Sequence, residues 1–212
     1  MPTTKRVGIF VYENFEPIDV WGYVQAFAIA RFLGQQYADT GPYPFKIVVI
    51  AKTQDPVRSY NGPAVAPDMT REQALADHFD VLMVPGGRGT EAVLKDAATI
   101  TWFKAMDAKV PLMTSVCTGA AVLAKAGLLD GKPATTNHNA FDWVRTFGPD
   151  VLWNRTSRWV DAGKYVSSAG VSAGTDMAFY LVARLCGQAV ADTAAAEAEY
   201  HWQRDPRVQQ PF

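Results

Sequence analysis

The chain has few cysteines, no long apolar run and no excess of charge. Only Cys117 and Cys186 occur in its 212 residues, and they lie in different predicted elements, so no disulfide framework is expected. The first apolar segment, residues 7–12, is too short for a signal-peptide core or a membrane span. We therefore expect a cytoplasmic protein that neither crosses nor binds a membrane.

Charge and histidine spacing argue against two further classes of function. The formal net charge is -1 and no basic stripe is present, so nucleic-acid binding has no electrostatic support, and no DNA-reading helical pair is found at either end. The three histidines, His78, His138 and His201, fall in separate predicted elements without ligand spacing. We expect no metal site and no cofactor, and a small molecule as the partner.

The remaining sequence predicts one α/β domain over residues 1–212. Its hydrophobic content of 49% suffices for one sizeable core, and no repeat or linker divides it. Predicted strands alternate with predicted helices, which indicates a mostly parallel sheet covered on both faces, with the site at the carboxyl ends of the strands. The strands are expected at 7–12, 45–51, 80–84, 110–114, 132–136 and 165–168, and the main helices at 18–33, 120–127, 140–147 and 172–187.

Smaller elements are predicted between these. Residues 59–68 read as a hairpin around Asn61-Gly62, residues 70–73 as a capping box that starts a short helix, and residues 151–161 as a strand pair. On the final helix, Glu197 and His201 are expected to share a face as a solvated ion pair. The aromatic and proline-bearing C-terminus either packs across a dimer or docks on its own chain; its members are Trp202, Pro206, Pro211 and Phe212.

Cys117 is the first candidate for a nucleophile. It lies at a predicted turn between the strand at 110–114 and the helix at 120–127. Backbone N–H groups and the helix dipole at such a turn favour a thiolate. Cys186, near the end of an apolar helix, is expected to be an inert core thiol.

The same sheet edge gathers further candidates. Asp19, at the start of the first helix, either complements the helix dipole or is a buried functional carboxyl group, and Glu13 and Glu16 are its rivals. Gly86 and Gly87 follow a strand and form either a tight turn or half of an anion hole. His138 is either a polar loop or helix-cap residue or the partner of the cysteine in a Cys-His dyad.

Several motifs occur together in the order and spacing of a known superfamily. They are Pro-Gly-Gly at 85–87, Ser-Val-Cys-Thr-Gly at 115–119, Gly-Leu-Leu-Asp-Gly at 127–131, Ala-Thr-Thr at 134–136 and Gly-Val-Ser-Ala-Gly-Thr-Asp at 170–176. Over nearly its whole length the chain resembles the ThiJ/PfpI superfamily. The resemblance implies a flavodoxin-like three-layer α/β sandwich, similar to class I glutamine amidotransferases, with a cysteine nucleophile elbow, and it implies a homodimer.

Within that superfamily the chain resembles the isocyanide hydratase branch. The similarity rests on the residues around Cys117 and on Ile-Asp-Val at 18–20 with Gly22, because many other members carry a glutamate in that helix. It implies that Cys117 attacks the isocyanide carbon, that Asp19 moves protons, and that the product is a formamide. It also implies that Thr118 contacts a reacting group, although Thr118 has a competing role as a helix cap.

The resemblance further places the amide N–H groups of Gly87, beside Gly86, and of Thr118 around either a developing negative charge or the attacking water. One departure concerns histidine, which members that use it tend to place directly after Ala-Thr-Thr, where this chain has Asn137. His138 comes one residue late, which weakens a Cys-His amidase or peptidase. A glyoxalase-like or deglycase-like activity, a hydrolase and a non-enzymatic cysteine oxidation sensor remain as alternatives.

Overall fold

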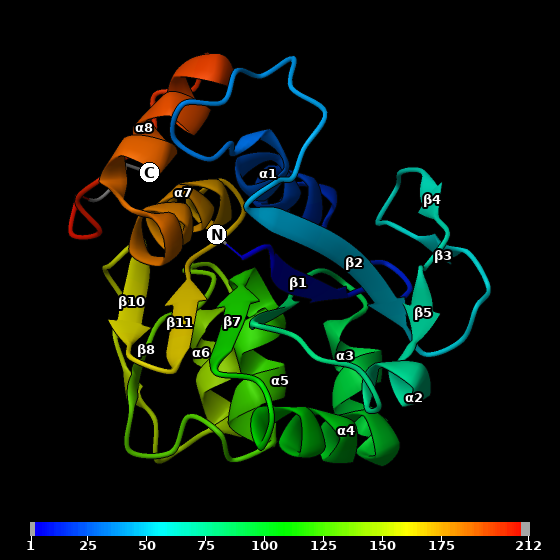
Figure 1. Ribbon diagram of the computed structural model, residues 1–212. Coiled ribbons are helices and arrows are strands. Elements are labelled where there is room, and N and C mark those ends of the chain that lie inside the picture. Colours follow the sequence, from blue (N-terminus) through cyan, green and yellow to red (C-terminus); the bar gives the residue numbers. More distant parts are fainter. Residues whose placement is uncertain (1–2, 209–212) are drawn as a thin grey trace.

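A seven-stranded sheet forms the middle layer of the molecule. The computed structural model describes residues 3–208, and the strand order is β10-β11-β7-β6-β1-β2-β5 (Figure 1). Neighbouring strands are parallel except β10, which runs antiparallel to β11. The strands are β1 (Lys5–Phe10), β2 (Phe45–Ala51), β5 (Met69–Thr70), β6 (Val81–Val84), β7 (Leu112–Val116), β10 (Trp159–Ala162) and β11 (Tyr165–Ser168).

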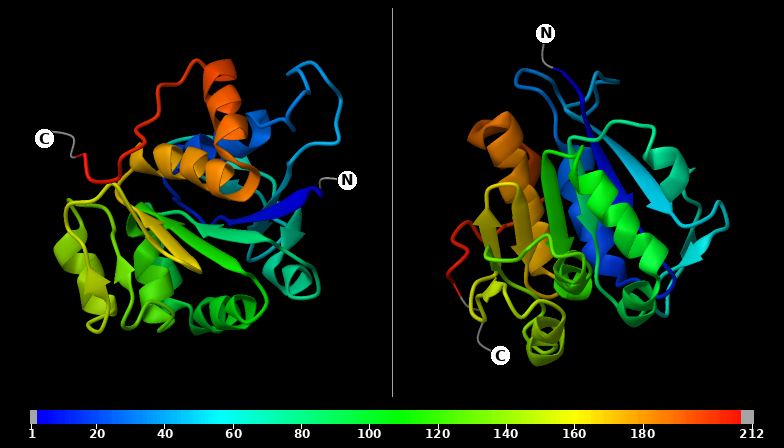
Figure 2. Two further views of the ribbon diagram at one scale, coloured as in Figure 1. Left: turned by 60° about the vertical axis from the view of Figure 1, so that its left-hand side comes forward. Right: turned by 90° about the horizontal axis from the view of Figure 1, so that it is seen from below.

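Helices cover both faces of this sheet, so the expected three-layer sandwich is confirmed (Figures 1 and 2). One face carries α1 (Pro17–Ile29), α7 (Ala173–Cys186) and α8 (Gln188–Glu197). The other carries α2 (Arg71–Ala74), α3 (Thr90–Lys95), α4 (Ala97–Asp107), α5 (Ala120–Lys125) and α6 (Phe141–Val144). Within residues 3–208 no helix is long and apolar enough to span a membrane.

The central strands read as continuous apolar runs because both faces of the sheet are buried. All of β6 is buried, as expected for a parallel strand between two helical layers. Aromatic rings fill the space on each side. Phe27 meets Phe45 edge to face at a centroid distance of 4.8 Å, and Phe10 meets Phe103 in the same way at 5.3 Å.

One predicted strand pair is absent, and one predicted strand lies outside the main sheet. The segment at 132–136 forms the short β8 (Pro133–Ala134), which pairs in parallel with β9 (Leu152–Trp153) outside the main sheet. β9 therefore does not pair with β10, and the strand pair expected within 151–161 is absent. The reason is a turn at Asn154, whose side-chain oxygen accepts hydrogen bonds from the backbone N–H groups of Thr156 and Ser157. This turn carries the chain from the small sheet to the large one.

The helices differ from expectation mainly in their ends. α1 stops at Ile29, and α8 stops at Glu197, so His201 lies outside α8 and the expected helical ion pair with Glu197 is absent. Neither α3 nor α4 was predicted from the sequence. The hairpin is present as β3 (Val57–Arg58) and β4 (Ala64–Val65), and the capping box at Thr70 and Gln73 starts α2 as predicted.

The C-terminal tail docks on its own chain. Trp202 is 5% exposed and stacks on Phe179, and the carbonyl of Pro206 accepts a hydrogen bond from the Arg158 backbone N–H. The buried carboxylate of Asp176 pairs with the Arg158 guanidinium and accepts a hydrogen bond from the Tyr200 hydroxyl. The self-docking alternative therefore holds up to residue 208, whereas Pro211 and Phe212 lie outside the described residues.

Candidate active site

The candidate site lies where the strand order reverses. From β1 the chain continues to β2 on one side, and then crosses to β6 and β7 on the other. The carboxyl ends of β1 and β6 therefore diverge into separate loops, and Phe15 after β1 forms an isolated bridge with Gly87 after β6. Ligands of open α/β sheets bind at this kind of crevice. The segments after β1, β6 and β7 contribute Asp19 in the first turn of α1, Gly86 and Cys117.

Cys117 occupies a strained turn at the end of β7. Its φ is 58°, a left-handed conformation that is uncommon for a residue with a side chain. Gly119 permits the turn, because a Cβ there would lie 2.3 Å from the carbonyl oxygen of Val84 in β6. The Thr136 hydroxyl donates to the carbonyl oxygen of Cys117 at 2.8 Å, which holds the turn from a third segment. The expected elbow is confirmed.

Asp19 is fully buried in the first turn of α1. Its Oδ2 accepts a hydrogen bond from the Gly86 N–H at 2.8 Å. Within residues 3–208 no N–H or O–H group donates to Oδ1, and the carboxyl group contacts the Cys117 thiol. A role confined to the helix dipole does not account for this placement, because the carboxyl group bonds to the neighbouring loop and not to α1.

Burial sets the protonation of Asp19. It raises the pKa of the carboxyl group to about 8, and the charge of Glu16 adds to the rise. The hydrogen bonds from Gly86 and Cys117 lower the pKa but do not outweigh burial. The rival carboxylate of Glu13 is turned elsewhere, since its Oε2 accepts a hydrogen bond from the Arg58 N–H. Asp19 is thus the buried acid beside the thiol.

The expected low pKa of Cys117 is wrong for the free protein. The side chain is 5% exposed, and burial followed by the nearby charge of Asp19 raises the pKa of the thiol above its usual value. The N–H groups of Thr118 and Val171 and the side chain of Asn137 hydrogen-bond to the sulfur and lower the pKa, but by less. Backbone donors are therefore present as predicted, and desolvation outweighs them.

The amide groups of Gly86 and Gly87 already have partners. The Gly86 N–H donates to Asp19, and the Gly87 N–H donates to the Thr118 hydroxyl at 3.1 Å. In the free protein these two N–H groups orient the Asp19 and Thr118 side chains, and a role of Gly87 around developing negative charge stays a prediction. A Cβ on Gly86 would lie 2.6 Å from Thr118 Oγ1 and 2.8 Å from the Cys117 Cβ, so only glycine fits between them.

Thr118 does not cap a helix. Cys117–Gly119 forms a single 3₁₀ turn, and α5 begins at Ala120 without a side-chain cap. Its hydroxyl instead accepts from Gly87 and lies 2.8 Å from the hydroxyl of Thr90, the first residue of α3. Thr118 Oγ1 and the Cys117 Cβ border the same small space at Gly86.

Two residues near the sulfur were not predicted. Asn137, the residue directly after Ala-Thr-Thr, reaches the thiol with its side chain, and Val171 offers its N–H from a backbone with a φ of 53°. For Asn137 the sequence held a signal, namely its position where related proteins place a histidine. For Val171 it held none, because a β-branched residue rarely adopts a positive φ.

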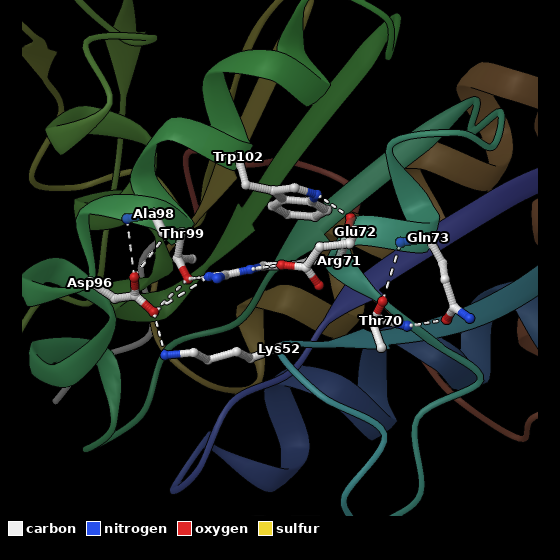
Figure 3. Close-up of polar contacts among 9 residues, drawn as sticks. All are labelled: Lys52, Thr70, Arg71, Glu72, Gln73, Asp96, Ala98, Thr99 and Trp102. Carbon is white, nitrogen blue, oxygen red and sulfur yellow. Dashed lines mark hydrogen bonds and ion pairs between the residues drawn. The ribbon is translucent and has the colours of Figure 1, made fainter.

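A second polar cluster lies away from the thiol. The guanidinium of Arg71 in α2 contacts Asp96 and Thr99, and the Lys52 ammonium also pairs with Asp96 (Figure 3). Asp96 additionally accepts from the N–H groups at the start of α4, so this cluster ties α2 and β2 to α4. Around it opens a hollow of about 600 Å³ whose inner wall includes Tyr12, but neither Cys117 nor Asp19 lines it.

No group of three or more His, Cys, Asp or Glu residues that could hold a metal ion occurs in the described part of the chain.

Comparison with known proteins places this geometry in a family. The family model described as the DJ-1/PfpI family matches residues 5–184. The chain belongs to the DJ-1/PfpI family. It is 34% identical to an isonitrile hydratase of Pseudomonas putida over 173 residues, which cover 78% of this chain and 74% of that protein. It is 29% identical to a deglycase of Pyrococcus abyssi over 58% of this chain and 72% of that protein.

A solved DJ-1/PfpI neighbour supports the fold. The crystal structure of a ThiJ/PfpI family protein from Pseudomonas syringae superposes with a TM-score of 0.82 at 30% identity, covering 99% of this chain and 78% of that one. The family assignment and the parallel sheet with a cysteine elbow were both predicted from the sequence motifs.

Proposed function

We propose that the protein is an isocyanide hydratase that converts an isocyanide and water into an N-substituted formamide. The contact between the buried Asp19 carboxyl group and the Cys117 thiol carries the proposal. An isocyanide presents one carbon that must accept both a nucleophile and a proton. A sulfur and an acid that touch each other can deliver both to the same atom.

The first half-reaction begins once the Cys117–Asp19 pair has lost one proton. The remaining proton moves to Asp19, and the Cys117 thiolate attacks the terminal carbon of R–N≡C. A C–S bond forms, the Asp19 proton is transferred to the same carbon, and a thioimidate, R–N=CH–S–Cys117, results. Asp19 is left as a carboxylate. Burial raises the pKa of the thiol above that of Asp19, so the pair with one proton rests as thiol and carboxylate, and transfer of that proton to Asp19 generates the reactive thiolate.

The second half-reaction uses the same carboxylate as a base. Asp19 takes a proton from a water molecule whose oxygen bonds to the thioimidate carbon, and returns that proton to the nitrogen. The hydroxyl proton then passes to Asp19, the C=O bond forms and the C–S bond breaks. The formamide R–NH–CHO leaves, and Cys117 thiolate and protonated Asp19 are regenerated. The 34% identity to an isonitrile hydratase agrees with this choice of reaction.

Two alternatives are less well supported. Cysteine oxidation follows thiolate character and exposure, and Cys117 is 5% exposed with a raised pKa, which argues against a primary role as an oxidation sensor. A Cys-His hydrolase needs a histidine at the thiol, and the side chain that hydrogen-bonds to the sulfur from this segment is that of Asn137. A third alternative, a deglycase-like activity, is supported by three curated relatives named deglycases, at 27–29% identity.

The test is to incubate the purified protein with alkyl and aryl isocyanides and to quantify the formamide by chromatography, with methylglyoxal assayed in parallel. We expect formamide from at least one isocyanide and a covalent adduct on Cys117 by intact mass under single-turnover conditions. Consumption of methylglyoxal without any formamide would replace the proposal with the deglycase alternative.

A further inference from the structure

A chain of three hydroxyl groups leads away from the thiol. Thr118 Oγ1 lies 2.8 Å from Thr90 Oγ1, and Thr90 Oγ1 lies 3.0 Å from the hydroxyl oxygen of Tyr12. Two backbone carbonyls complete the group: that of Gly87 lies 2.8 Å from Thr90 Oγ1, and that of Pro85 lies 2.6 Å from the Tyr12 hydroxyl. Tyr12 and Thr90 are buried, so their hydroxyl protons must be satisfied within this group.

Counting protons orients the chain. Each hydroxyl group has one proton to donate, and a carbonyl oxygen only accepts. The Tyr12 hydroxyl donates its proton to the Pro85 carbonyl, and the Thr90 hydroxyl donates its proton to the Gly87 carbonyl. The contact between Thr90 and Thr118 at 2.8 Å then has one donor left, the Thr118 hydroxyl. No hydroxyl proton then remains to lie between the Tyr12 and Thr90 oxygens, which form the longest of these contacts.

The result fixes what Thr118 offers to the site. Its proton points to Thr90, and one of its lone pairs accepts the Gly87 N–H. The second lone pair accepts no hydrogen bond within residues 3–208, so the hydroxyl can offer a ligand only an acceptor. The sequence resemblance implies that Thr118 contacts a reacting group without specifying whether the hydroxyl donates or accepts.

We propose that Thr90 is a positioning residue that holds the Thr118 hydroxyl as a hydrogen-bond acceptor for the water of the second half-reaction. The inference rests on the proposed function. The water donates one proton to the Asp19 carboxylate and the other to Thr118 Oγ1. Its lone pair then faces the thioimidate carbon. Attack of the thiolate on the isocyanide involves no such water, so Thr90 acts on hydrolysis of the adduct and not on its formation.

The test compares Thr90→Val with Thr90→Ser and with the control Thr99→Val. Valine has the shape of threonine but leaves the Thr118 proton without its acceptor, and serine restores that acceptor. Thr99 is as buried as Thr90 and donates within the separate polar cluster at α4 (Figure 3), so its valine variant controls for loss of a buried threonine hydroxyl. Single-turnover adduct formation and steady-state formamide production are measured for each, with melting temperatures.

For Thr90→Val we expect adduct formation at the wild-type rate, accumulation of the adduct by intact mass, and a kcat lower by on the order of 10²-fold, as for a misplaced reacting group. Thr90→Ser and Thr99→Val should turn over at close to the wild-type rate. Equal loss in adduct formation and hydrolysis, or a normal kcat in Thr90→Val, overturns the role of Thr90.

Neutron diffraction on the deuterated wild-type protein tests the proton arrangement without any substrate. We expect the Thr118 deuteron on the line to Thr90 Oγ1 and the Thr90 deuteron toward the Gly87 carbonyl. A Thr118 deuteron directed toward Cys117 overturns the inference whatever the reaction is. A wild-type protein that forms neither adduct nor formamide refutes the proposed function and the water-orienting role with it, and the neutron result then judges the proton arrangement by itself.

Discussion

Asp19 and Cys117 shift each other's proton affinity in opposite directions. The thiol donates to the carboxyl group and lowers its pKa, whereas the charge on Asp19 raises the pKa of the thiol. Both effects act on top of burial, which raises both pKa values. The two groups therefore titrate as one unit, and the apparent pKa values belong to the pair.

Asp19→Asn should strongly lower turnover yet stabilise the fold. The amide still accepts the Gly86 hydrogen bond but moves no proton, so we expect kcat to fall by ~10²–10⁴-fold. Because folding raises the pKa of Asp19 from 3.8 to about 8, the wild type loses stability as the pH rises through that window. The melting temperature of the variant should exceed that of the wild type by a margin that grows from pH 4 to pH 8.

A helix-dipole role for Asp19 makes the opposite prediction. It requires a stability loss of roughly 0.3–1 kcal/mol in Asp19→Asn, with turnover preserved. Calorimetry at several pH values together with formamide assays separates the two outcomes.

The pH dependence of kcat/KM reports ionisation of the free enzyme. Since attack needs the pair that has lost one proton, kcat/KM should rise about tenfold per pH unit at low pH and level off above about pH 8, where Asp19 titrates. A rate that instead falls as the pH passes 8 would mean that the doubly protonated pair is the active form. Asp19→Asn, assayed at high enzyme concentration, should lack this inflection.

Much of the fold could be predicted from the local pattern of apolar and polar residues in the sequence. β2 was predicted with its observed bounds because Phe45–Ala51 is apolar apart from Lys46 and precedes a polar loop. α3 and α4 were missed because Asp96 serves both as the last cap of one and the first cap of the other, so no loop separates them. The wrong pairing of β9 shows a further limit, since nothing in a two-residue strand specifies its partner.

The candidate site, like the fold, could be predicted from the sequence only in part. The motifs around Cys117 and Gly86 marked the elbow and the loop that meets it, because glycine is required where two turns touch. The protonation states of the site could not be predicted from the sequence, because the pKa of Cys117 depends on burial and on Asp19, which lies far away in the chain. Thr90 carried no local signal either, because its role depends on distances to Thr118 and Gly87.

Cys117→Ala should remove all isocyanide turnover and adduct formation, because the sulfur forms the bond to carbon. Its matched control is Cys186→Ala, which lies at the end of α7 away from the site and should cost on the order of 1 kcal/mol of stability with little change in kcat. Comparable loss of turnover in both variants would show that the wrong thiol has been assigned.

Gly86→Ala should damage the site more than the fold elsewhere. The added Cβ would lie 2.5 Å from the Thr118 backbone nitrogen, so the two loops must separate, at about 1–3 kcal/mol. That movement also pulls the Gly86 N–H from Asp19, so kcat should fall together with the melting temperature. Gly131→Ala, at a φ of 67° with open space around it, should lower the melting temperature and leave kcat intact.

Asn137→Ala tests which side chain after Ala-Thr-Thr acts on the thiol. The Asn137 hydrogen bond lowers the pKa of Cys117, so its loss should raise that pKa further and shift the pH profile of iodoacetamide alkylation upward. Measuring this in a Cys186→Ala background leaves one reactive sulfur. His138→Ala should leave both the alkylation profile and kcat near wild-type values, because the proposed mechanism assigns its proton transfers to Asp19. If His138→Ala abolishes turnover while Asp19→Asn retains it, the sulfur works with a histidine, and a Cys-His hydrolase becomes the better account of this site.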